Sequence, residues 1–320
     1  MEKKYDFIGR LSRDFPSQIV VDVTDVCNLE CVHCPHPDYK KSDYYKKSYL
    51  DIKLNNKMVD EVAKYGQGHT GYIRYTSNGE PLMHPQIYDM LDYAVKNSGV
   101  FVTLTTNGTI LNEKRVEKLL SSGLHMIDIS IDAFKADTYS AIRVKGKLDV
   151  TQKHVLRLLE LKKELKANTY IILSFIEQEN NLDEAKMFEE YWLEKGADKV
   201  IIRRLHSAAG FVESISNELK KQHENISRYP CLYPWERITL NPLGELSFCP
   251  QDWLHKSSMV NYQDITIKEL WQSDIYKSLR KAHLENNYTD HQFCGNCPDW
   301  AQTRWPGEGK SYADMVEEFI

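Results

Sequence analysis

Hydrophobic residues follow two alternating spacings from about residue 18 to residue 205. Six short runs are rich in β-branched and aromatic residues, as buried strands are. They lie at residues 19–23, 72–76, 100–105, 126–131, 170–175 and 199–203. Between them, apolar residues recur at helical spacing at residues 55–64, 87–96, 113–120, 150–166 and 183–195. Six strand–helix repeats predict an α/β fold, a partial (β/α)6 barrel whose parallel sheet is wrapped by helices.

The pattern changes after residue 207. Residues 208–229 are polar and irregular, as expected of a linker with some helix. Two short apolar runs flank a turn with Pro242 and Gly244 and predict a β-hairpin, and a helix is expected at residues 267–283. The predicted organisation is an N-terminal extension, a barrel, a linker, a small C-terminal module and a tail, at residues 1–16, 17–207, 208–230, 231–300 and 301–320.

Charge and hydropathy narrow the functional classes. The 320 residues include 41 basic and 46 acidic ones, a net charge of -5 that is too mild and too evenly spread to predict nucleic-acid binding. No apolar run approaches the roughly 20 residues of a membrane span, and the first residues lead into no hydrophobic signal sequence. We therefore expect a soluble cytoplasmic protein that binds neither nucleic acid nor a membrane.

Seven cysteines fall into two groups that are far apart in the chain. The first group is Cys27, Cys31 and Cys34, and the second is Cys231, Cys249, Cys294 and Cys297. Grouped cysteines in a reducing compartment indicate metal. Three thiols leave one iron of a four-iron cluster open to another ligand, whereas four thiols can close a cluster. Zinc is the alternative metal for either group.

The spacing Cys-x3-Cys-x2-Cys at the carboxyl end of the first strand resembles that of the radical S-adenosylmethionine superfamily. The resemblance implies that the open iron chelates S-adenosylmethionine and that one electron cleaves this cofactor to a 5'-deoxyadenosyl radical. It also implies two [4Fe-4S] clusters, one that binds S-adenosylmethionine and one auxiliary, and a flavodoxin- or ferredoxin-type electron donor.

The same resemblance implies a set of residues that bind S-adenosylmethionine. The candidates are His33, Asn78, Gly79, Glu80, Asn107, Ser130, Asp132 and Arg143. The loop after the second strand, Ser77 to Pro81, would hold the methionine amino group, with Glu80 as its acceptor. Arg143 would pair with the methionine carboxylate, and His33 would lie beside the adenine. An ordinary loop and a solvated arginine are the alternatives.

The second cysteine group resembles the short auxiliary-cluster module called twitch, which is related to the longer SPASM domain. Its spacing is similar to that of the branch that contains the aminocyclitol dehydrogenase of butirosin biosynthesis. An oxidised auxiliary cluster can accept the electron of a substrate radical, so the resemblance implies oxidation of a secondary alcohol of a sugar or cyclitol to a ketone. The expected partner is thus a small, carbohydrate-like molecule.

The candidate catalytic residues follow the sixth predicted strand. Arg203 and Arg204 could orient an alkoxide, and His206 could accept its proton; strand alternation points only one of the two arginines inward. Surface arginines and an incidental histidine are the alternative. Other functions stay open: modification of a peptide or protein, as in sulfatase maturation or thioether formation, a redox-neutral sugar rearrangement or dehydration, or a zinc-stabilised binding protein.

Overall fold

The computed structural model describes residues 5–76 and 78–320, and these residues form one nine-stranded sheet. The strand order is β6-β5-β4-β3-β2-β1-β7-β8-β9. The strands are β1 Gln18–Asp22, β2 Tyr72–Thr76, β3 Phe101–Thr106, β4 Met126–Ser130, β5 Tyr170–Ile176, β6 Lys199–Arg203, β7 Arg237–Leu240, β8 Glu245–Ser247 and β9 Ser258–Asn261. The first six strands pair in parallel, each with its neighbour in the chain. The predicted α/β fold with a partial barrel is confirmed, and each predicted strand agrees with the observed one to within one residue at either end.

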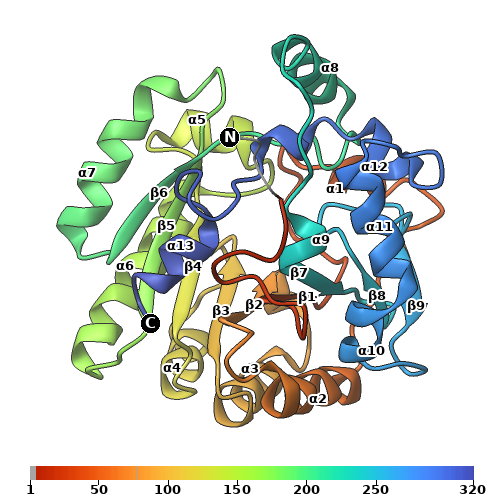
Figure 1. Cartoon of the computed structure of the whole chain (residues 1–320). Helices are drawn as coiled ribbons and strands as arrows, with labels where there is room; N and C mark the ends of the chain where they lie inside the picture. The colour runs from red at the N-terminus through yellow and green to blue at the C-terminus, as the bar shows by residue number, and fades with distance from the viewer. Residues whose placement is uncertain (1–4, 77) are drawn as a thin grey trace.

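Helices connect the parallel strands and cover the outer face of the sheet (Figure 1). Those of the barrel are α1 His36–Tyr39, α2 Ile52–Glu61, α3 Ile87–Asn97, α4 Glu113–Ser121, α5 Ala136–Ile142, α6 Leu148–Glu164 and α7 Ala185–Lys195. Alternation along β1 places Ile19 and Val21 in the main core, which the helices share, and leaves Val20 and Asp22 on the inner face. The polar inner face is therefore free to line a cavity.

Further helices follow the barrel. They are α8 Glu213–Gln222, α9 Tyr233–Glu236, α10 Ile267–Gln272, α11 Asp274–Leu284, α12 Gln292–Asn296 and α13 Tyr312–Glu317. The single helix predicted at residues 267–283 is wrong, because the chain turns at Ser273 and forms α10 and α11. Ser273 has an extended backbone, and its hydroxyl accepts the amide of Tyr276 as the N-cap of α11.

The C-terminal hairpin continues the barrel sheet. β7 pairs in parallel with β1, Gln18 opposite Arg237, and β8 and β9 then add antiparallel strands. The tight turn between β7 and β8 needs Gly244, whose φ of +79° lies in the left-handed region. The barrel and the cysteine-containing C-terminal part thus share one sheet, while the domain boundaries given above stay predictions.

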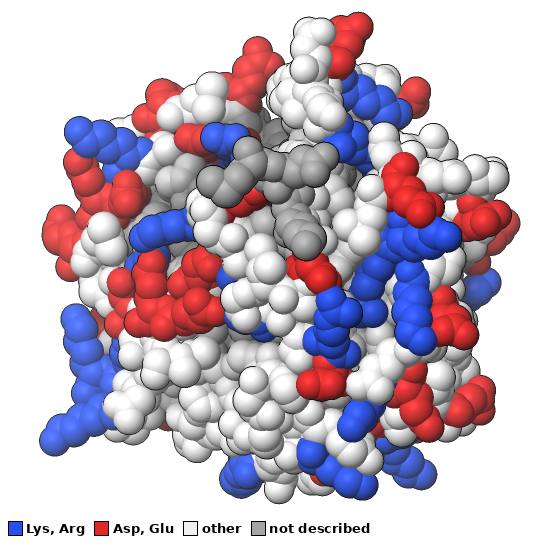
Figure 2. All heavy atoms as spheres, viewed as in Figure 1, with Lys and Arg blue, Asp and Glu red and all other residues white. Residues whose placement is uncertain are grey.

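The last helix, α13, covers the inner face of the sheet at the end where the parallel strands begin. Ala313, Met315 and Val316 of α13 pack against apolar residues at the beginning of β2 to β5, and Figure 1 shows this helix lying across the sheet. Asp314 accepts a hydrogen bond from Arg10 at 2.7 Å, which ties α13 to the beginning of the chain. No helix among the described residues is long and apolar enough to cross a membrane. In Figure 2, basic and acidic side chains are interspersed over the visible face.

Candidate active site

The first three cysteines lie on one loop that directly follows β1. The backbone amides of Glu30 and Val32 donate to the carbonyls of Val144 and Ile142, at 3.0 Å each, and so fix the loop against the end of α5. Cys31 is buried, and Cys27 and Cys34 are partly buried. One continuous segment therefore brings the three thiols together at the carboxyl edge of the sheet.

The loop after β2 lies directly on this cysteine loop. The amides of Gly79 and Glu80 donate to the carbonyls of Thr24 at 3.0 Å and of Val26 at 2.8 Å. A Cβ atom at Gly79 would lie 2.2 Å from the Val26 oxygen, so only glycine fits at this position. Ser77, which precedes this loop, lies outside the described residues.

Glu80 connects the ends of β2 and β3 to the cysteine loop. Its buried carboxylate accepts the Thr106 hydroxyl at 2.6 Å and the Asn107 amide at 2.7 Å. The Asn107 side chain donates in turn to Asn28, next to Cys27, at 2.9 Å. Burial raises the pKa of Glu80, and these donors counteract the effect. Glu80 thus supports the loop through protein hydrogen bonds, and its predicted contact with S-adenosylmethionine stays a prediction.

Asp132, just beyond β4, contacts two other predicted cofactor-binding residues, Arg143 and His33. Its Oδ2 atom lies 2.5 Å from Nη2 of Arg143 and 3.6 Å from Nε2 of His33, and its backbone φ of +66° is left-handed. The Nη1 atom of Arg143 lies 3.7 Å from the Cys31 sulfur, while Nε has no partner within the described part of the chain. Burial lowers the pKa of His33 to about 4, so this ring is neutral at pH 7.

The three thiols need a cation to become thiolate ligands. Burial raises the pKa of Cys27 and of Cys34 to about 12, and it raises that of Cys31 against the charge of Arg143. Iron would supply the compensating charge when it displaces the protons. The buried thiols, with Arg143 beside one of them, fit an iron-sulfur cluster with one open iron.

The remaining four cysteines line one cavity beside β7 and β8. Cys231 precedes α9, Cys249 follows β8, and Cys294 and Cys297 lie in and after α12. Within residues 5–76 and 78–320, no three His, Cys, Asp or Glu side chains gather closely enough to hold a single metal ion. Four thiols around a shared space can supply one thiolate to each iron of a four-iron cluster.

A larger cavity of about 1410 Å³ lies between the inner face of the barrel, the C-terminal cysteine region and the last 20 residues. Cys34 lines one side of it, and Pro250 and Gln251, which directly follow Cys249, line another. Among the predicted cofactor-binding residues, His33, Asn78, Ser130 and Arg143 border this cavity. Gly79, Glu80, Asn107 and Asp132 instead form the supporting contacts described above.

Known protein families match both cysteine regions. A model described as the radical SAM superfamily matches residues 21–188, more than half of the chain. The chain belongs to the radical SAM superfamily. A second model, SPASM, described as an iron-sulfur cluster-binding domain, matches residues 231–298. The resemblance inferred from the cysteine spacing is confirmed, and the chain is a radical SAM enzyme with a SPASM domain that binds S-adenosylmethionine and iron-sulfur clusters.

Among curated proteins, radical SAM relatives have different activities. The chain is 34% identical over 128 residues to an AdoMet-dependent heme synthase of Methanosarcina barkeri, covering 40% of this chain and 34% of the relative. It is 34% identical over 163 residues to a GTP 3',8-cyclase of Clostridium perfringens, covering 50% of this chain and 48% of the relative. The matches thus span less than half of either relative.

Solved structures share the fold of most of the chain. BtrN in complex with AdoMet and 2-DOIA aligns with a TM-score of 0.59 at 18% identity, covering 88% of this chain and 92% of that one. SuiB of Streptococcus suis bound to its precursor peptide SuiA aligns with a TM-score of 0.65 at 13% identity, covering 95% and 73%. At these identities the likeness shows the fold alone.

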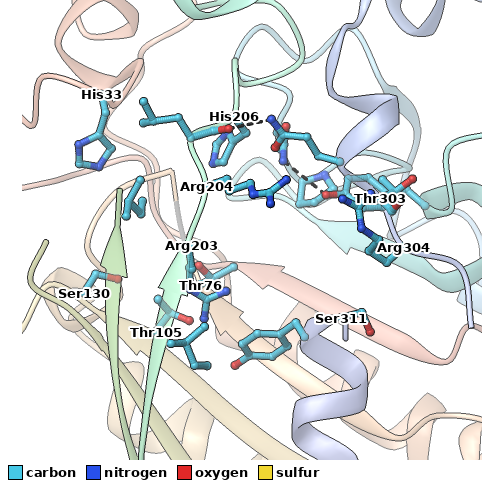
Figure 3. A pocket seen from close by; sticks show the side chains of 18 of the residues that line it. His33, Thr76, Thr105, Ser130, Arg203, Arg204, His206, Thr303, Arg304 and Ser311 are labelled. Atoms are coloured by element: carbon cyan, nitrogen blue, oxygen red, sulfur yellow. Dashed lines mark hydrogen bonds between the residues drawn. The ribbon is translucent and has the colours of Figure 1, made fainter. Parts of the chain in front are cut away.

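The predicted catalytic residues of this radical SAM enzyme all border the cavity (Figure 3). Arg203 points inward, where Nη2 lies 2.7 Å from Asp128 and Nε lies 3.0 Å from the Ser174 hydroxyl. Arg204 borders the cavity as well, because it lies one residue beyond the end of β6, where the alternation of the strand no longer applies. Nδ1 of His206 accepts the amide of Ala208 at 3.2 Å, so the neutral ring carries its proton on Nε2. Burial lowers the pKa of His206, which keeps the ring neutral. His206 is therefore arranged to donate a hydrogen bond from Nε2, and its role as proton acceptor stays a prediction.

Sequence reasoning missed several residues of the cavity wall. Asp128 of β4 is buried and holds Arg203, and Tyr312 of α13 lies with its ring 4.0 Å from the Arg74 guanidinium on the cavity floor. Glu177, one residue beyond β5, borders the cavity, and its carboxylate has no partner within the described ranges. The alternation along β4 could have indicated Asp128, since it places this charged residue on the inner face of the sheet.

Proposed function

We propose that the chain oxidises a secondary alcohol of a sugar or cyclitol to a ketone, with the auxiliary cluster as electron acceptor. The observation that carries this proposal is one continuous cavity of about 1410 Å³ that reaches from Cys34 to the residues next to Cys249. A substrate in this cavity would lie between the two cysteine groups. The fold shared with BtrN, a radical SAM dehydrogenase of butirosin biosynthesis, supports the same reaction type.

The two clusters, which we propose to be [4Fe-4S], and S-adenosylmethionine would supply a 5'-deoxyadenosyl radical and an acceptor for one electron. Loss of a hydrogen atom from the carbinol carbon, of the hydroxyl proton to a base and of one electron converts the alcohol to a ketone. The protein must therefore supply the base. A flavodoxin- or ferredoxin-type protein is the proposed source of the electron that starts each turnover.

Glu177 is our candidate for this base. Its carboxylate borders the cavity and has no competing partner among the described residues, and its backbone amide is bonded to the Arg203 carbonyl at 2.9 Å. Nε2 of His206 would donate to the substrate oxygen and orient it. Arg203 is a positioning residue in this scheme, because Asp128 and Ser174 already hold its guanidinium.

His33, Asn78, Ser130 and Arg143 are the proposed contacts of S-adenosylmethionine, since they border the cavity beside the first cysteine group. The free Nε atom of Arg143 could donate to the methionine carboxylate while Asp132 holds the rest of the guanidinium. Gly79, Glu80, Asn107 and Asp132 would act through the loops that they position.

Anaerobically reconstituted protein tests the proposal with S-adenosylmethionine, a reductant and a panel of sugars and cyclitols deuterated at one carbinol carbon. We expect deuterium in 5'-deoxyadenosine together with a ketone product. Cleavage of S-adenosylmethionine with deuterium transfer but an unoxidised product would contradict the proposal and establish a redox-neutral rearrangement or dehydration instead.

Peptide modification is a second candidate because the cavity exceeds the roughly 300 to 1,000 Å³ of common small-molecule sites, and SuiB binds its precursor peptide in the same fold. The presence of S-adenosylmethionine in the cavity would account for part of this excess. A panel of peptides in the same deuterium assay separates the two candidates.

A further inference from the structure

We propose that Arg204 and Arg304 together bind a phosphoryl group, so that the substrate is a phosphorylated or nucleotide-activated sugar. This inference rests on the proposed function for the reaction and adds the class of substrate. The two arginines come from distant parts of the chain and border the same cavity. In Figure 3, Arg204 points from the end of β6 toward the segment that carries Thr303 and Arg304.

Both guanidinium groups are available to an anion. The side chain of Arg204 forms no hydrogen bond or ion pair with any residue that the structure describes. Nη1 of Arg304 donates to the carbonyls of Ala301 at 2.9 Å and Thr303 at 3.3 Å, and no described carboxylate lies within ion-pair distance. Charged donors in an enzyme cavity without an acidic partner favour an anionic ligand.

Two acidic residues of the cavity wall, Glu236 and Asp128, are already paired with arginines. Glu236 lies 3.1 Å from Nη2 of Arg10 and also pairs with Arg237, and Asp128 pairs with Arg203. These pairs neutralise the acidic residues nearest to the barrel floor. Glu177 and Glu218 also border the cavity and form no ion pair with a described residue, whereas Arg204 and Arg304 add two positive charges at the end of β6 and in the C-terminal segment.

A hydrogen bond fixes the two arginines on a common wall. The Gln302 side chain donates to the carbonyl of Leu205 at 2.8 Å. Leu205 follows Arg204, and Gln302 precedes Arg304 by two residues. The strand end and the C-terminal segment are thus joined beside the proposed site, which limits the cost of ordering it on binding.

The donor set suits a phosphoryl group. Two separately mounted guanidinium forks match an anion with three oxygens and a charge near two, whereas a carboxylate is satisfied by one fork. The predicted role of Arg204 in orienting an alkoxide is replaced here by a role in substrate binding.

Calorimetric titration of the anaerobically reconstituted holoprotein with inorganic pyrophosphate, in the presence of S-adenosylmethionine, tests the site. We expect saturable binding that weakens about tenfold in Arg204→Gln and in Arg304→Gln, and further in the double variant. Binding should also weaken as ionic strength rises. Lys153→Gln is the matched control, because it removes the same charge from an exposed position on α6 outside the cavity.

Unchanged pyrophosphate binding in both arginine variants would overturn the proposal. Equal competition by acetate would overturn the phosphoryl assignment in favour of a carboxylate. Arg204→Lys and Arg304→Lys, which keep the charge and remove the fork, should restore part of the binding and show that the Gln variants lose a specific contact.

The site and the reaction fail in distinguishable ways. Arginine-dependent pyrophosphate binding without ketone formation from any phosphorylated sugar would leave the site standing and refute the oxidation. Ketone formation from neutral sugars only, without pyrophosphate binding, would refute the site and leave the oxidation standing.

Discussion

The two cysteine groups are held by the chain in different ways. Three cysteines of the first group lie on one loop at the end of a barrel strand, and the loops after β2 and β3 support them from below. The four cysteines of the second group come from three distant segments, which meet because β7 extends the sheet beside β1. The first site is therefore a local feature of the barrel, whereas the second depends on the complete tertiary fold.

The cysteine ligands themselves give the largest expected contrast. Replacing Cys27, Cys31 and Cys34 by Ala should remove about four of eight irons and abolish formation of 5'-deoxyadenosine. Replacing Cys231 and Cys249 by Ala should also remove about four irons but leave S-adenosylmethionine cleavage intact and abolish the ketone.

Iron and zinc content, with 5'-deoxyadenosine and ketone measured on the same samples, check this contrast. Wild-type protein with about four irons and one zinc would contradict the auxiliary cluster, because zinc accepts no electron. Ketone formation at the normal rate by the Cys231 and Cys249 variant would likewise rule out the cluster as acceptor.

The proposed base should separate the two half-reactions. Glu177→Gln keeps the shape of the side chain but cannot accept the hydroxyl proton, so we expect ketone formation to fall about 10²-fold. Cleavage of S-adenosylmethionine at the first site should remain within a few-fold of wild type. A Glu177→Gln variant with normal ketone formation would move the base elsewhere in the cavity.

The sequence predicted the local site well and the assembled site only in part. The barrel strands were found because buried runs such as residues 72–76 are flanked by polar loops, and the first cysteine loop follows such a run directly. The pairing of Gln18 with Arg237 leaves no local pattern, because it joins segments more than 200 residues apart in the chain. The sequence also could not predict which ring nitrogen of His206 carries the proton. This depends on the amide of Ala208, which donates to Nδ1 from a turn where φ is +53°.

Gly79→Ala should disturb the first cysteine group alone. The added Cβ would lie 2.2 Å from the Val26 oxygen, so the cysteine loop must move, at a cost of about 2 kcal/mol. We expect a lower iron content and slower S-adenosylmethionine cleavage, while the absorbance of the auxiliary cluster persists.

Gly71→Ala is the control for this substitution. The nearest atom to its added Cβ, the Ser17 oxygen, lies 3.8 Å away, which is ordinary contact. Equal iron loss in both variants would mean that the contact between the two loops does not support the first cluster.

Ser273→Ala should weaken the frame of the second group by a smaller amount. The Ser273 hydroxyl accepts the Tyr276 amide and donates to the Leu270 carbonyl at 2.7 Å, so its loss leaves the first turn of α11 uncapped. Such a cap contributes about 1 kcal/mol, which corresponds to about 2 °C in the melting temperature of the reconstituted protein. Ser278→Ala removes a hydroxyl from the exposed face of the same helix and should leave the melting temperature unchanged.

The destabilisation caused by Ser273→Ala should also appear as earlier release of the auxiliary iron on heating. The reason is that α11 packs beside the segment of Cys231, where the Cys231 amide lies 3.4 Å from His283. Release of both clusters at one temperature would instead mean that the shared sheet makes the two sites unfold together.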